Sequence, residues 1–275
     1  GHIGVVGSTL PIPLTVLVQD ASSAPLTGVG VGFAISSPTV DVGQGFDTAD
    51  TQTGADGKAN AVFRLGSIPA EYEATCVCQS CQMDASSVTF KACGKLGTDE
   101  FRQGDVRWGD TRLGANPPHF QIRQTGCALT SVANLINFYA GISTAIARTD
   151  PLQLNQRMTD FEVYNSSDDV RWRHVPLLAS QRIHHIGTSS GRTALLRATA
   201  VGRMDADLAS GLPVIIHAVR SPAPDRRIRD HFMLAIGKCG NNYIIADPAS
   251  STGEALYDPN NPQLTLQEIQ RYAPL

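Results

Sequence analysis

The first third of the chain alternates short apolar runs with turn-forming residues. Between Leu10 and Cys93 the apolar runs are only a few residues long, and Gly, Pro, Ser, Asp and Thr separate them. In one of these runs Tyr72, Ala74 and Cys76 occupy alternate positions and would share one face of a strand. This spacing predicts a small all-β sandwich of antiparallel strands. The predicted strands cover residues 14–18, 29–35, 60–65, 72–76 and 88–92.

Beyond a short polar linker at residues 94–100 the hydrophobic period changes. Leu129, Val132 and Leu135 recur at helical spacing, and this run ends at Gly141. Thr265 and Glu268 form a capping box that predicts a terminal helix. We therefore expect two domains, the sandwich over residues 1–94 and an α+β domain over residues 95–275. Further helices are predicted after residue 150 and over residues 194–196 and 204–210, and strands over residues 214–219, 231–236 and 243–246.

Composition narrows the choice of partners. The 275 residues include 22 basic and 25 acidic side chains, which gives a formal net charge of −3. This balance gives no electrostatic reason to expect nucleic acid or an anionic membrane as a partner. No apolar run is long enough to cross a bilayer, and no signal peptide is visible. The oligomeric state is not indicated.

Four of the six cysteines, Cys76, Cys78, Cys81 and Cys93, lie close together in the predicted sandwich. They could form one or two disulfides, or they could hold a metal ion. No histidine lies near them and their spacing is tight, so we favour disulfides over a metal site. Disulfides form in oxidising compartments, so this choice predicts an exported protein. Cys239, in a predicted turn, is expected to be an exposed bystander.

The remaining cysteine, Cys127, has the surroundings of a nucleophile. It is expected at the start of a helix, where unpaired backbone N–H groups favour a thiolate. His231 opens an apolar run that predicts a strand, and the next predicted strand ends at Asp247. A base and an acid that orients it are what a cysteine nucleophile requires. The alternative is that Cys127 is an inert core residue, because most buried cysteines are.

Other histidines compete for the role of base. His217 lies inside an apolar strand and is expected to be a core residue, while His184 and His185 lie in a region without a strand signature. None of them is followed by an acid placed as Asp247 is to His231. The chain has no zinc-binding His-X-X-X-His helix, so a metal enzyme is not indicated.

The first domain resembles the bacterial Ig-like repeats of intimin and invasin type adhesins. The resemblance rests on the segments Pro13–Val16, Val18–Asp20, Pro25–Val31 and Thr51–Phe63, the last with Asp56-Gly57 at a turn. In that family such domains are extracellular spacers or binding modules. The resemblance therefore implies a secreted or cell-surface bacterial protein.

The second domain resembles the papain-like cysteine peptidases, and among them the peptidases that process bacteriocins after a double glycine. The matching motifs, in chain order, are Gln103–Trp108, Gly126–Ser131, Gly211–Ile216, His231-Phe232 and Ala246–Pro248. The resemblance implies a nucleophile at Cys127, a base at His231 and an orienting acid at Asp247. It also implies a glutamine in the oxyanion hole. Gln103 matches the motif of the family, while Gln121 has the usual papain separation from the cysteine and Gln124 lies closer still.

These inferences predict a cysteine peptidase that hydrolyses a peptide bond through a Cys-His-Asp triad and a thioester, without a cofactor. The family is often fused to membrane segments and an ATPase, which this chain lacks, so cleavage after a double glycine is less well supported. Two alternatives stay open. The same triad could deamidate or transamidate a glutamine of a target protein, as a toxin would. The domain could also be an inactive part of an adhesive binding protein.

Overall fold

The computed structural model describes residues 2–36, 41–81, 87–117, 119–220 and 229–275. The chain forms two compact units, one of residues 1–95 with 238–240 and one of residues 96–237 with 241–275. In the described part of the chain, none of the helices is long and apolar enough to cross a membrane.

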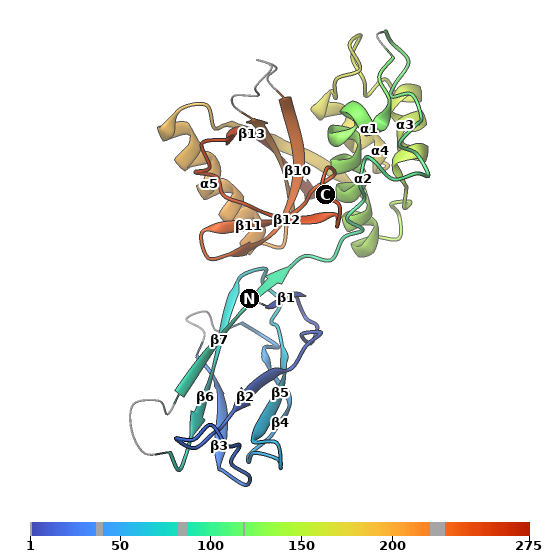
Figure 1. Cartoon of the computed structure of the whole chain (residues 1–275). Helices are drawn as coiled ribbons and strands as arrows, with labels where there is room; N and C mark the ends of the chain where they lie inside the picture. The colour runs from blue at the N-terminus through green and yellow to red at the C-terminus, as the bar shows by residue number, and fades with distance from the viewer. Residues whose placement is uncertain (1, 37–40, 82–86, 118, 221–228) are drawn as a thin grey trace. The chain divides into compact units, whose positions relative to one another are not determined.

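The first unit is built from two small sheets (Figure 1). One sheet holds β1 (His2–Val5), β3 (Val31–Ile35), β6 (Glu71–Cys78) and β7 (Ser87–Lys95), and the other holds β2 (Leu14–Leu17), β4 (Gly45–Ala49) and β5 (Lys58–Arg64). Apart from β1, which runs parallel to β7, these strands pair antiparallel.

Side chains from both sheets pack into a shared core, so this unit is a β-sandwich. Leu14 and Phe63 come from one sheet, Tyr72 and Ala74 from the other, and all four are almost fully buried in one cluster. The predicted alternation in β6 is confirmed, because Tyr72, Ala74 and Cys76 are buried while their neighbours are more exposed. The strand periodicity was therefore enough to predict which face of β6 is buried.

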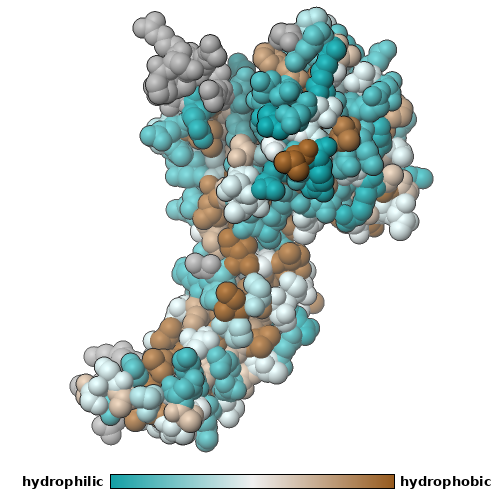
Figure 2. Space-filling view, turned by 45° about the vertical axis from the view of Figure 1, so that its right-hand side comes forward, coloured by the Kyte–Doolittle hydropathy of each residue, from teal (hydrophilic) through white to brown (hydrophobic). Residues whose placement is uncertain are grey.

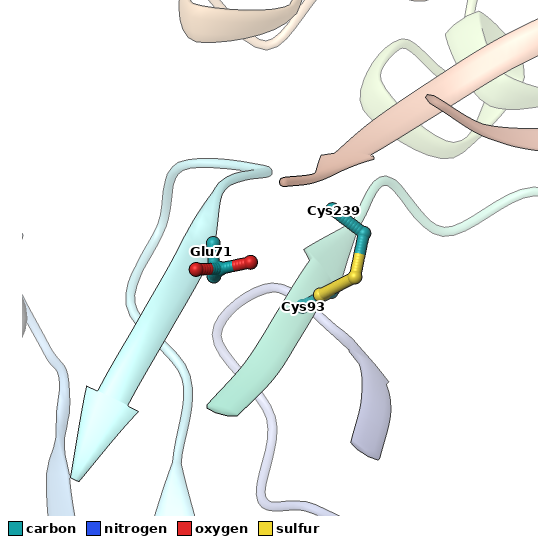
Figure 3. A group of neighbouring side chains, drawn as sticks. All are labelled: Glu71, Cys93 and Cys239. Atoms are coloured by element: carbon teal, nitrogen blue, oxygen red, sulfur yellow. A yellow bond between two sulfur atoms is a disulfide. The ribbon is translucent and has the colours of Figure 1, made fainter. Parts of the chain in front are cut away.

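Two disulfides lie in this unit. Cys78 is bonded to Cys81, which agrees with the expectation of disulfides inside the cysteine cluster. Cys93 is instead bonded to Cys239, far away in the sequence (Figure 3). The expectation that Cys239 is a bystander was wrong, because spacing along the chain does not reveal a partner 146 residues away. Cys76 is free and buried, and burial raises the pKa of its thiol.

A carboxylate lies beside the Cys93–Cys239 disulfide. Figure 3 shows Glu71 on the strand next to Cys93, and one ligand atom from each of the three residues falls within 4.8 Å of the others. A cysteine binds a metal ion as a thiolate, and here both sulfur atoms are bonded to each other in the disulfide. Glu71 itself accepts a hydrogen bond from Lys91 at 2.7 Å. The group is therefore a disulfide with a neighbouring ion pair.

The second unit combines helices with an antiparallel sheet. Its strands run in the order β8-β13-β9-β10, with β11 paired to β10 and β12 to β11. Figure 1 shows α5 at one side of these strands and α1 to α4 gathered at the other. Hydrophilic residues cover most of the face of this unit that Figure 2 presents. The helices are α1 (Ile122–Thr125), α2 (Cys127–Ile142), α3 (Pro151–Asp160), the 3-10 turn η1 (Trp172–His174), α4 (Val175–Leu178) and α5 (Ala194–Ala209), and the strands are β8 (Ile183–Ser190), β9 (Val214–Arg220), β10 (Arg229–Cys239), β11 (Asn242–Ala246), β12 (Glu254–Tyr257) and β13 (Leu264–Pro274).

The predicted terminal helix is wrong, because residues 264–274 form β13. Leu266, Ile269 and Tyr272 are buried at a spacing of three, which is typical of a helix. In the structure this spacing comes from register shifts, one near Glu268 and one between Arg271 and Tyr272. A β-bulge moves the following side chains to the other face, so it breaks the alternation that marks a strand.

Smaller differences concern neighbouring elements. The two short helices expected over residues 194–196 and 204–210 are one continuous helix, α5. His184 and His185, expected outside a strand, lie in β8. The helix predicted after Asp150 is confirmed, and the Asp150 side chain caps it by accepting a hydrogen bond from the backbone N–H of Gln153.

We predict that removing the long-range disulfide destabilises the protein far more than removing the short one. Replacing Cys93 and Cys239 by serine should lower the free energy of unfolding by about 2–4 kcal/mol, because the unfolded chain is then no longer cross-linked over a long loop. Replacing Cys78 and Cys81 releases a loop of sequence separation 3 rather than 146 and serves as the control. Urea unfolding followed by fluorescence measures both. Equal losses for the two pairs would contradict the prediction.

Candidate active site

Cys127 is the first residue of α2, as predicted. A short helix, α1, precedes it, and Gly126 forms the junction between the two. A Cβ atom at Gly126 would lie 2.5 Å from the backbone oxygen of Ile122, so only glycine fits this close junction. The junction leaves the first N–H groups of α2 without partners inside the helix, which favours negative charge at Cys127. Cys127 itself is 8% exposed.

Helix α2 is buried on nearly all sides, which fixes the position of Cys127. Twelve of its residues are buried, including polar ones. The Asn137 side chain donates to the Thr149 backbone oxygen and accepts from the Thr149 N–H, both at 2.8 Å. Asn134 accepts a hydrogen bond from the Phe101 N–H at 2.9 Å. These buried amides connect the helix to the segments on either side of it in sequence.

His231 and Asp247 are brought together by a pair of adjacent strands. His231 lies near the start of β10, and Asp247 follows β11, which pairs with β10. The two side chains are hydrogen-bonded, with 2.7 Å between His231 Nε2 and Asp247 Oδ1. The same carboxylate oxygen accepts a hydrogen bond from the Ala249 N–H at 2.8 Å. Each side chain is 18% exposed, so the pair is largely shielded from water.

His231 also interacts with Cys127, whose side chain contributes to raising the pKa of the histidine. Because Nε2 is used by Asp247, Nδ1 is the ring nitrogen left for the sulfur. Burial lowers the pKa of His231, but the hydrogen bonds and charges of Asp247 and Cys127 outweigh burial and raise this pKa to about 9. Burial raises the pKa of Asp247, but His231, the Ala249 N–H and the charge of Arg220 together outweigh burial and lower this pKa. The His231 ring can therefore stay protonated at neutral pH, between the Asp247 carboxylate and the Cys127 side chain.

Of the three candidate oxyanion glutamines, the structure places Gln103 between the segments that carry the other residues. Its backbone N–H donates to the Pro248 oxygen, and its side-chain Nε2 donates to the Arg123 oxygen, both at 2.9 Å. It thus contacts the turn before Cys127 and the residue after Asp247. Gln121 and Gln124 instead form the capping box of α1.

Trp108 holds the loop that carries Gln103. The ring is 2% exposed, and its Nε1 donates to the Arg102 oxygen at 2.8 Å. It also packs edge-on against Phe101, with 5.5 Å between ring centroids. A buried donor paired with a backbone oxygen keeps the loop in one shape.

The structure shows a second histidine with acidic partners, which the sequence analysis missed. His217 Nε2 lies 2.9 Å from Asp230 Oδ1, and His217 Nδ1 lies 3.7 Å from Glu268 Oε1. These contacts outweigh burial and raise the pKa of His217. Asp230 immediately precedes His231, but Glu268 lies on β13, which was predicted as a helix, so no local signal revealed this pairing. With both nitrogens facing carboxylates, His217 has none left for a thiol.

Comparison with known proteins assigns this chain to a family. The model of the Peptidase_C39 like family matches residues 115–273, which is more than half of the chain and includes Cys127, His231 and Asp247. Among curated proteins no sequence matches. A solved structure described as a candidate C39-like peptidase from Bacillus anthracis is 15% identical, with a TM-score of 0.34 over 53% of this chain and 88% of that one.

We predict that His231 stays protonated well above neutral pH. Its folded-state pKa of about 9 lies above the ordinary value of about 6.5. Its stabilising contribution is therefore complete below pH 6.5 or so and is lost as the pH rises through about 9. Asp247→Asn removes the carboxylate and should lower the midpoint of the His231 titration, which histidine-selective NMR measures directly.

Asp230→Asn is the matched control for this titration. It should lower the midpoint of His217, whose pKa Asp230 helps to raise, and should leave His231 unchanged. A His231 midpoint near its ordinary value in the unmodified protein, insensitive to Asp247→Asn, would contradict the arrangement.

Proposed function

We propose that this chain, which belongs to the Peptidase_C39 like family, is a cysteine peptidase that hydrolyses a peptide bond with Cys127 as its nucleophile. The observation that carries the proposal is the position of His231, which interacts with Cys127 and is hydrogen-bonded to Asp247. A base that contacts both a nucleophile and an orienting acid is what covalent catalysis by cysteine requires.

The proposed reaction begins with the Cys127 thiolate, which attacks the carbonyl carbon of the peptide bond. The negative charge that develops on the carbonyl oxygen is stabilised by the Cys127 backbone N–H at the start of α2 and by an N–H of the Gln103 amide. The Gln103 Nε2 carries two hydrogens, and the bond to the Arg123 oxygen uses one of them. The other can therefore donate to the substrate.

His231 then gives its proton to the leaving amine, which breaks the C–N bond and leaves a thioester on Cys127. A water molecule transfers a proton to His231 and attacks the thioester. The acid product leaves, and the thiolate and imidazolium are restored. Asp247 keeps Nδ1 directed at the reacting atoms throughout, because its own hydrogen bond is to Nε2. No cofactor takes part in this proposed cycle.

The first unit and the location of the protein form a separate part of the proposal. We propose that the sandwich is an Ig-like spacer or binding module and that the protein is secreted or displayed on a bacterial surface. The two-sheet architecture supports the first point, and the two disulfides support the second, since disulfides persist in oxidising compartments. The expected partner is a peptide or protein substrate.

We predict that the Cys127→Ala variant loses peptide hydrolysis by at least about a thousandfold, because the nucleophile is removed. The full chain is incubated with unfolded protein substrates, and mass spectrometry follows the products. Cys76→Ala is the matched control, since Cys76 is the other free cysteine and lies in the sandwich. It should retain full activity.

The same experiment separates the alternatives. Chain cleavage supports the peptidase. The small mass gain of deamidation, or attachment of an amine, without cleavage would favour a deamidase or transamidase. If the unmodified protein does neither and iodoacetamide fails to label Cys127 at neutral pH, the second unit is inactive and an adhesive role gains support.

We also predict that Gln103→Ala lowers kcat by about a hundredfold or more with little change in KM, as expected when one oxyanion donor is lost. Gln121→Ala and Gln124→Ala should each cost less than about tenfold, because these side chains cap α1. Steady-state kinetics on a peptide substrate measures all three. A larger loss for Gln121→Ala or Gln124→Ala than for Gln103→Ala would reassign the donor.

A further inference from the structure

A polar hollow lies next to the proposed oxyanion glutamine. Its water-accessible volume is about 580 Å³, and it is lined by residues 102–106, Arg123 and residues 248–251. Gln103 is therefore part of its wall. The other two segments adjoin the proposed site as well, since Arg123 lies in α1, directly before Cys127 and α2, and residue 248 follows Asp247. A peptide bound at Cys127 would have part of its length beside this hollow.

Small residues leave space in part of the wall of the hollow. Gly104, Ala249, Ser250 and Ser251 line it, and a Cβ atom placed on Gly104 would meet nothing within 4 Å. The Arg102 Nη1 donates to the Ser251 oxygen at 2.6 Å, which connects the two sides of the hollow. This bond keeps the hollow in shape while most of the guanidinium stays available.

Two arginines give the hollow a positive charge. The side chains of Arg102 and Arg123 are 46% and 42% exposed. Arg123 pairs through Nη2 with Asp110 at 2.7 Å, and an arginine has five N–H donors, so both guanidiniums keep donors for a ligand.

The carboxylate that lines the hollow offsets only part of this charge. Asp105 is 12% exposed and is held by Arg107, with bonds of 2.9 and 2.8 Å to its two oxygens. Its distance to Arg102 is 3.9 Å, which is beyond hydrogen-bonding range. Asp105 is thus hydrogen-bonded to Arg107 and forms only a long ion pair with Arg102, so both lining arginines keep unused donors for a ligand.

Gln103 supplies an acceptor to complement these donors. Its Oε1 is buried and has no hydrogen-bond partner in the described part of the chain. The orientation of the amide follows from the Arg123 oxygen, which requires a donor and therefore faces Nε2. A buried acceptor without a partner is costly, so a ligand that brings an N–H group to it would be favoured.

We propose that this hollow binds a carboxylate of the peptide substrate. Arg102 and Arg123 donate hydrogen bonds to the carboxylate, and Gln103 Oε1 accepts one from a nearby peptide N–H. The inference rests on the proposed peptidase function and names its substrate class, peptides that carry a carboxylate close to the cleaved bond. Two sources supply that group, the side chain of Asp or Glu and the α-carboxylate at the end of a peptide. Arginine recognises both through charge-assisted hydrogen bonds.

A peptide library tests the proposal with the full chain. One half of a proteome-derived library is left untreated, and in the other half all carboxylates are converted to methyl esters. We expect cleavage of the esterified half to fall by about tenfold or more, the usual effect of losing a charge-assisted hydrogen bond. In the untreated half, cleavage sites should cluster near Asp and Glu or near peptide ends, which distinguishes the two sources.

Variants connect the preference to the hollow. Arg102→Gln and Arg123→Gln should each reduce the preference for untreated peptides by about tenfold. Arg148→Gln is the matched control, because Arg148 is an exposed arginine paired with one aspartate, Asp99, and does not line the hollow. It should leave the preference unchanged. Equal cleavage of the two halves, or a preference that both arginine variants retain, would overturn the inference and leave the peptidase function intact.

Binding to the Cys127→Ala variant separates the two levels of the argument. Untreated peptides should bind this variant more tightly than esterified ones, and Arg102→Gln or Arg123→Gln in the same background should remove the difference. If such binding occurs while the unmodified protein cleaves neither half, the proposed peptidase function fails, but the inference that the hollow binds carboxylates is supported. If binding ignores esterification, the inference about the hollow is overturned.

Discussion

The hydrogen bond between His231 and Asp247 is the constraint on which the candidate site depends. The bond is 2.7 Å long. His231 lies on β10 and Asp247 directly follows β11, so the pairing of these two strands determines whether the bond forms. The bond occupies Nε2 and leaves Nδ1 for Cys127. Together with the charge of Asp247 and the interaction with Cys127, it outweighs the effect of burial on the pKa of His231, which would otherwise favour a neutral ring. Without the carboxylate the pKa of His231 would fall, because only Cys127 would then oppose the effect of burial.

The other half of the site is rigid for a different reason. Cys127 begins a helix that is buried on nearly all sides, and the buried amides of Asn134 and Asn137 bind the backbone of one segment before the helix and one after it in sequence. A thiol on such a helix has little freedom to move away from its partner. The sheet and the helix therefore meet at His231 and Cys127 with both partners fixed, which is the pre-organisation that covalent catalysis needs.

The sequence predicted the features that depend on short-range patterns. The position of Cys127 at a helix start, the alternation in β6 and the cap at Asp150 were all visible in local spacing. Features that depend on distant residues were missed. Bulges in β13 gave Leu266, Ile269 and Tyr272 the spacing of a helix, and the partner of Cys93 lies across 146 residues. The candidate glutamines could be named but not distinguished, because only the fold shows that Gln121 and Gln124 cap α1 while Gln103 contacts the turn before Cys127.

A comparison of His217 with His231 indicates what separates a structural histidine from a candidate base in this fold. Both are partly buried, both contact carboxylates, and both have a raised pKa. A raised pKa is therefore not sufficient to identify a base. His217 faces a carboxylate with each of its nitrogens, so both N–H groups of its protonated ring are directed at acceptors of the protein. His231 uses one nitrogen for Asp247 and turns the other toward a nucleophile. An imidazole can pass a proton to a substrate only through a nitrogen that the protein has not already paired with a carboxylate, and of these two histidines His231 alone meets that condition.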